Sequence, residues 1–131
     1  MPTISRWFVR SALASLLLGL GLGAASGWWG GAGLLAPTVL HLLVVGWLTQ
    51  MVFGVAFWLF PKYSTDQPRG PEWLAWICWG SLNVGVLVRV VAEPLAAAGR
   101  PVPAALIVSA LLQLVAAIAF AVNTWPRTRA R

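Results

Sequence analysis

Apolar residues along the chain form four long stretches, which short segments rich in glycine and proline separate. The stretches cover about residues 7–26, 37–60, 73–95 and 102–125. Each has the length of about 20 residues that a helix needs to cross the hydrocarbon core of a bilayer. Glycine and proline interrupt helices between them. The pattern predicts an all-α, integral membrane four-helix bundle, with residues 1–131 forming a single four-span domain.

The composition excludes the soluble classes. Hydrophobic residues make up 60% of the chain and charged residues 9%, with a mean hydropathy of +0.82, whereas soluble domains are about 25% charged. The one cysteine, Cys78, excludes an internal disulfide and a CxxC redox or zinc motif. A net charge of +6 would indicate a nucleic-acid partner in a soluble protein. Here we expect membrane lipid as the partner and no nucleic acid.

The charges of the connecting segments predict an orientation. With the N-terminus inside, the inner side carries Arg6, Arg10, Lys62, Arg69, Arg127, Arg129 and Arg131, whereas the outer loops carry Arg100 alone. The positive-inside rule therefore predicts a multi-pass protein of the cell inner (cytoplasmic) membrane, N-in and C-in. The first apolar run, preceded by arginines and followed by Ala24-Ala25-Ser26, also fits a cleaved signal peptide. We expect it to be kept as the first span.

Small residues recur at four-residue spacing along the first span, at Ser11, Ser15, Gly19, Gly23 and Gly27. Such a stripe lets a neighbouring backbone approach closely. The neighbour is either another helix of the same chain or a second copy, and both remain open. Because four helices enclose little interior and the chain has one histidine, we expect a homodimer.

Two amides are expected near mid-membrane, at Gln50 and Gln113. They fit either an amide–amide hydrogen bond between helices or separate bonds to nearby carbonyls. At 100° per residue, Gln50 is predicted to lie on the opposite side of its helix from His41.

Three ionisable side chains fall within the predicted spans and are the candidates for function: His41, Arg89 and Glu93. A buried charge costs on the order of 2.5–3.5 kcal/mol on insertion scales. With the N-terminus inside, all three lie in the outer leaflet, and Asn83 lies deeper on the third span. Arg89 and Glu93 have i, i+4 spacing and can pair. This is either a self-neutralised ion pair or an arginine that binds a carboxylate or phosphate.

His41 leads a helix face that is otherwise apolar, formed by Val44, Val45, Leu48, Val52, Val55 and Leu59. Such a face suits a flat hydrophobic macrocycle that an imidazole ligates, and it suits ordinary helix packing equally well. A neutral histidine that bonds a backbone carbonyl is the alternative for His41.

The segment 41–64, HLLVVGWLTQMVFGVAFWLFPKYS, resembles the second helix of subunit I of the heme-copper oxidases, the superfamily of cytochrome c oxidases and nitric oxide reductases. In that family a histidine near the outer end of this helix ligates heme, and an apolar helix with Met, Gly and aromatic positions ends at a proline. His41, Met51, Gly54 and Pro61 fit this layout. The chain departs from the family in having four spans and one histidine, which excludes a copper-linked oxygen-reducing centre.

The resemblance implies that His41 is the metal ligand of a heme b. Arg89, Glu93 and Asn83 are the further candidate cofactor-binding residues, with Arg89 facing the propionates. The expected function is electron transfer, or binding and sensing of a diatomic gas, through an electron-transfer partner or a gas ligand. One alternative is a non-catalytic accessory subunit of a respiratory membrane complex. Another is a small dimeric cation or drug transporter that uses Glu93.

Overall fold

The computed structural model describes residues 1–128, and most of them are helical. Helix α1 covers Thr3–Trp28, α4 covers Glu72–Ala97, and α5 covers Pro103–Thr124 before the short 3-10 turn η2, Trp125–Thr128. Between α1 and α4, three helical segments follow one another without a break: α2 (Ala32–His41), the π-helix η1 (Leu42–Thr49) and α3 (Gln50–Leu59). We call this continuous helix, Ala32–Leu59, span two. The four resulting helices are each long and apolar enough to cross a membrane, which confirms the predicted fold class.

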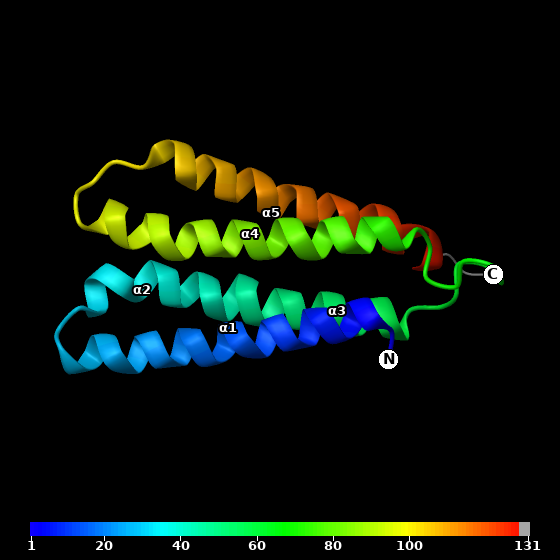
Figure 1. Cartoon of the computed structure of the whole chain (residues 1–131), viewed down its shortest axis with the longest axis horizontal. Coiled ribbons are helices and arrows are strands. Elements are labelled where there is room, and N and C mark those ends of the chain that lie inside the picture. Colours follow the sequence, from blue (N-terminus) through cyan, green and yellow to red (C-terminus); the bar gives the residue numbers. More distant parts are fainter. Residues whose placement is uncertain (129–131) are drawn as a thin grey trace.

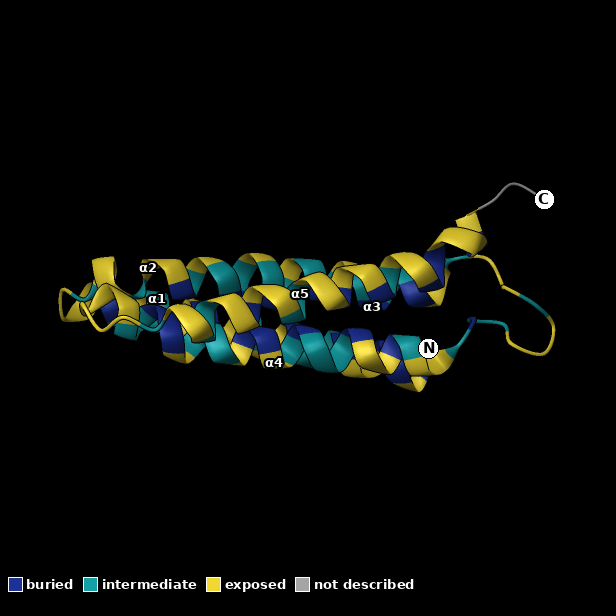
Figure 2. Ribbon diagram, turned by 90° about the horizontal axis from the view of Figure 1, so that it is seen from above, coloured by how far each residue is buried: buried dark blue, intermediate teal, exposed yellow. Residues whose placement is uncertain are grey.

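The helices form two antiparallel hairpins, α1 with span two and α4 with α5 (Figure 1). Span two and α4 lie in the middle of the arrangement, and α1 and α5 flank them (Figure 1). The N-terminus, the end of α5 and the α3–α4 connection lie at one end of the bundle, which we call the terminal end. The α1–α2 and α4–α5 connections lie at the other, which we call the loop end. The outward helix faces are exposed along most of their length (Figure 2), as lipid contact requires.

The small residues of the first span pack against span two within the chain. A Cβ added to Gly19 would lie 3.0 Å from the Leu43 side chain. On the opposite side, a Cβ on Gly46 would lie 2.8 Å from Ser15 Oγ, and one on Gly54 would lie 2.6 Å from Phe8 Cβ. Close approach of two helices is what small-residue stripes permit. The intramolecular interpretation of the stripe is therefore the one that the structure shows.

The best-packed part of the bundle is an aromatic core in the terminal half. Phe53 of α3 and Phe120 of α5 stack with ring centroids 3.9 Å apart, and Phe57 meets Phe120 edge-on at 5.3 Å and Phe8 of α1 at 5.5 Å. Phe8 and Phe57 are completely or almost completely buried. These rings join α1, span two and α5 at this end of the molecule.

A buried arginine closes the same end. Arg127, 3% exposed, donates from Nε to the carbonyl of Pro61 at 2.9 Å and from Nη2 to the carbonyls of Phe57 and Phe60 at 3.1 and 2.9 Å. The last carbonyls of a helix have no partners within the helix and attract cations. Arg127 bonds the Phe57 carbonyl in the last turn of α3 and the two carbonyls just after it, and thereby ties the end of α5 to the end of span two.

The π-helix η1 changes which residues of span two face α4. Bonding from i to i+5 places more residues in each turn than an α-helix has, and Thr49 Oγ1 donates five residues back to the Val44 carbonyl at 2.9 Å. As a result, His41 and Gln50 both bond side chains of α4. The prediction that Gln50 lies opposite His41 is wrong, because it assumed 100° per residue throughout.

Candidate functional site

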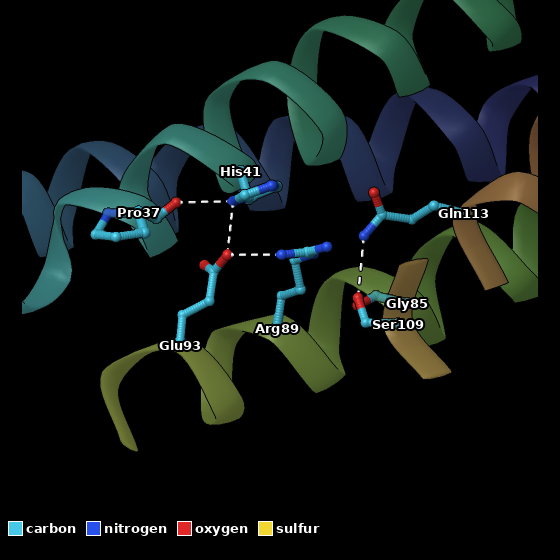
Figure 3. A network of polar contacts seen from close by, with 7 residues as sticks. All are labelled: Pro37, His41, Gly85, Arg89, Glu93, Ser109 and Gln113. Atoms are coloured by element: carbon cyan, nitrogen blue, oxygen red, sulfur yellow. Dashed lines mark hydrogen bonds and ion pairs between the residues drawn. The ribbon is translucent and has the colours of Figure 1, made fainter. Parts of the chain in front are cut away.

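Three ionisable side chains from two helices meet near the loop end of the bundle (Figure 3). His41 is the last residue of α2, and Arg89 and Glu93 lie one turn apart on α4. Glu93 Oε1 lies 2.8 Å from His41 Nδ1 and 3.0 Å from Arg89 Nη1. One carboxylate oxygen is thus shared by an imidazole and a guanidinium. The i, i+4 pair was predicted, whereas the contact between His41 and Glu93 was not.

The His41 ring is oriented by two acceptors at the same nitrogen. Nδ1 lies 3.0 Å from the carbonyl of Pro37, one turn earlier in α2, as well as 2.8 Å from Glu93. We therefore assign the proton of the neutral ring to Nδ1. The carbonyl bond expected for a packed histidine is present. Within residues 1–128, Nε2 has no hydrogen-bond partner and is not enclosed. The nitrogen with the free lone pair is the accessible one.

Burial differs among the three side chains in a graded way. Glu93 is 7% exposed, Arg89 19% and His41 30%. Glu93 Oε2 and Arg89 Nε are buried and have no hydrogen-bond partner among the described residues. The Glu93 carboxylate is therefore the enclosed centre of the cluster, and the His41 imidazole is the part of the cluster most exposed at the surface. Desolvation strengthens the attraction between the charges but costs more for each ion.

Asn83, also predicted as a site residue, is held elsewhere. Its Oδ1 accepts from Gln50 Nε2 at 3.1 Å, and its Nδ2 donates to the Trp79 carbonyl at 2.8 Å. It lines a crevice with Ser11 and Ser15 of α1. Asn83 therefore belongs to a second cluster of polar side chains, with Gln50, Ser11 and Ser15, which the sequence did not predict.

The two mid-membrane amides do not bond each other. Gln113 Nε2 donates to Ser109 Oγ at 3.1 Å, and Ser109 Oγ donates to the Gly85 carbonyl at 2.7 Å, joining α5 to α4 (Figure 3). Gln50 bonds Asn83 instead. Gln50 and Gln113 thus each support the contact of their own helix with α4. The contact between α5 and span two is made by the aromatic rings instead.

The ligand set at His41 restricts what the site can hold. Within the described residues 1–128, no three His, Cys, Asp or Glu side chains come together in a way that could hold a metal ion. A metal bound here would have to arrive with most of its ligands, as it does in a porphyrin. Val44, Leu48 and Val52 follow His41 along span two and are each about half exposed. A single accessible imidazole beside exposed apolar side chains fits such a group.

Comparisons with protein-family models, with curated proteins and with solved structures find no match to this chain.

Proposed function

We propose that the protein is a membrane-embedded b-type heme-binding protein in which His41 Nε2 is an axial ligand of the iron. The observation that carries the proposal is the asymmetry of the His41 ring. Nδ1 is engaged by the Pro37 carbonyl and by Glu93, and Nε2 is accessible on a helix whose following side chains Val44 and Leu48 are apolar and exposed.

Metal-ligating histidines usually give their other N–H to a carboxylate or a backbone carbonyl, because this fixes the tautomer and makes the free nitrogen a better ligand. His41 has one partner of each kind before any metal is bound. An imidazole held only for packing needs one such partner. The doubled acceptor supports a ligand role over a packing role.

Each residue of the cluster has a distinct part in this proposal. His41 holds the iron, and Glu93 fixes the plane and tautomer of the ring. Arg89 gives Nη1 to Glu93 and retains Nη2, which is not among the buried atoms, for an anionic group such as a propionate. Heme would supply one-electron chemistry or a coordination position for a diatomic gas.

A heme that each chain holds by one histidine is either open at its sixth position or shared with a second copy. The proposal therefore includes a homodimer as one of two arrangements, in the inner membrane with both termini in the cytoplasm. Native mass spectrometry of the heme-loaded protein counts the copies. An alkaline phosphatase fusion at the C-terminus should be inactive, and activity there would overturn the orientation.

The test compares His41→Ala with Asn83→Leu, after expression with ample heme. His41→Ala removes the imidazole that would hold the heme iron and should abolish the absorbance at about 410 nm, the region of a histidine-ligated heme. The second alters a residue that the structure places away from His41, so the absorbance should remain. If the wild-type protein shows no such band, the heme proposal fails. Equal loss in both variants would show a general effect on folding.

Arg89 is tested by neutralising the ion pair as a whole. Arg89→Leu alone leaves Glu93 unpaired, so its effect mixes charge with folding. The double variant Arg89→Leu/Glu93→Gln removes both charges. If the double variant retains heme as well as the wild type, then Arg89 is a structural counter-ion and has no role in holding the propionates.

One observation favours the accessory-subunit alternative. Only 17–28% of the residues in each span's most apolar window are buried within the chain, which leaves wide surfaces for a larger complex. A colourless protein that co-purifies with respiratory subunits would support it. The transporter alternative is weaker, because Glu93 already has two partners.

A further inference from the structure

A second polar site lies in the crevice between α1 and α4, near the middle of both helices. The crevice has a volume of about 260 Å³ and its polar side chains are Ser11, Ser15 and Asn83. The Ser11 hydroxyl donates its one hydrogen to the Trp7 carbonyl and accepts from Trp79 Nε1. The crevice is thus a built polar feature at a depth where water is scarce.

Several polar groups in and beside the crevice have unused hydrogen-bonding capacity. Asn83 gives one N–H of its amide to the Trp79 carbonyl, and an amide has a second. Among residues 1–128, the Ser15 hydroxyl has no hydrogen-bond partner. Gln50, which is 0% exposed and bonds Asn83, has a buried Oε1 without a partner in the same described range. Of these groups, Asn83 Nδ2 and Ser15 Oγ can donate to a ligand oxygen, whereas Gln50 Oε1 can only accept. Unsatisfied donors in an apolar medium are costly, so a ligand oxygen that accepts from them gains affinity.

The remaining walls define what the ligand is. They are apolar, from Leu18, Leu42 and Val86 among others, and no charged side chain of the described residues lines the crevice. Leu18 and Leu87, at its edge, are 45% and 62% exposed, so the crevice opens sideways toward lipid. An ion or a charged head group has no counter-charge here. A neutral molecule that dissolves in the bilayer has both access and a matching surface.

We propose that this crevice binds a small neutral lipid-soluble molecule with carbonyl or hydroxyl oxygens on an apolar ring, the quinone class. Its oxygens accept from Asn83 Nδ2 and Ser15 Oγ, and its ring lies against the aliphatic walls. The volume is close to the lower end of small-molecule pockets, about 300 Å³. The site lies on the α1 side of α4 and does not depend on heme at His41.

The experiment measures equilibrium binding of decylubiquinone to the purified full-length protein. Decylbenzene, which has the apolar body without the oxygens, serves as the matched probe. Asn83→Leu should weaken decylubiquinone binding about tenfold, because it removes the main donor. Ser81→Ala, on α4 with its hydroxyl bonded to the Ile77 carbonyl, should leave binding unchanged. Equal binding of the two probes would overturn the proposal.

Asn83→Leu also removes a partner of Gln50, so a second variant leaves every polar contact in place. Ala14 lines the crevice and is exposed, and Ala14→Phe fills the opening. It should abolish binding while the protein stays folded by circular dichroism. Unchanged decylubiquinone binding in Ala14→Phe refutes the site. Heme content, read in the same samples, reports on His41 separately: His41→Ala should keep decylubiquinone binding, and Asn83→Leu should keep heme.

Discussion

The terminal half and the loop half of the bundle are held together by different forces. In the terminal half, Phe8, Phe53, Phe57 and Phe120 join the helices by ring contacts, and Arg127 caps α3. In the loop half, span two and α4 are linked by the charged cluster around Glu93. Packed phenylalanine rings have no group that can bind a ligand or exchange a proton, whereas a carboxylate shared by two donors can exchange its hydrogen-bond partners. The ring contacts therefore lie at one end of the bundle and the ionisable cluster around Glu93 at the other.

The largest effect should come from Phe57→Ala, which removes a ring that is 1% exposed and contacts two other phenylalanines. We expect a loss of about 4 kcal/mol in the free energy of unfolding, the range for a buried Phe→Ala change. Reversible unfolding in mixed detergent measures it. Val44→Ala, on the exposed face of the loop half, is the control and should cost far less. Equal costs would contradict the division into two halves.

Arg127→Met is the second test of the terminal half. It retains most of the side-chain volume but removes the donors to the carbonyls of Phe57, Phe60 and Pro61. We expect a loss of about 2 kcal/mol, in line with hydrogen bonds to charged groups. Arg100→Met changes an exposed arginine at the loop end and should stay within about 0.5 kcal/mol of the wild type.

The smallest effect on stability, and the sharpest test of the loop half, should come from deleting Val44 in the π-helix. A π-turn holds one residue more than an α-turn, so the shortened span two runs as an α-helix in which both His41 and Gln50 still face α4. We expect a cost of about 1 kcal/mol, since α-helical bonding replaces the π pattern.

Crosslinking measures the deletion in a Cys78→Ala background. Cysteine pairs at positions 41 and 93 and at positions 50 and 83 should each crosslink in both the full-length chain and the deletion variant, because η1 holds the extra residue. If the 41–93 pair crosslinks only in the full-length chain, then η1 does not set the direction of His41.

The four spans could be predicted from the sequence, because apolar runs long enough to cross a bilayer as a helix are seldom found outside transmembrane segments. The observed helices begin and end within about five residues of the predicted limits. Within one helix, spacing also predicted the Arg89–Glu93 pair. Both results depend on local regularity. Arg129 and Arg131, which were part of the charge bias, lie outside the described residues.

Contacts between helices were harder to predict, since they depend on rotation about each axis. Equal depth suggested that His41, Arg89 and Glu93 belong together, but not that Glu93 bonds His41. The π-helix then rotated Gln50 toward Asn83, which no α-helical count predicts. The stripe of small residues fitted two neighbours, and only the packed structure shows that span two is one of them.

The length of the helices has a consequence for where the cluster lies in a membrane. A helix of 26 residues is about 39 Å long, and the hydrocarbon core of an average bilayer is about 30 Å thick. This positive hydrophobic mismatch is relieved by tilting or by local thickening of the lipid. Because His41 is the tenth residue of span two, its distance from the water interface then varies with the tilt. Acyl-chain length becomes a means of setting how deeply the imidazole lies.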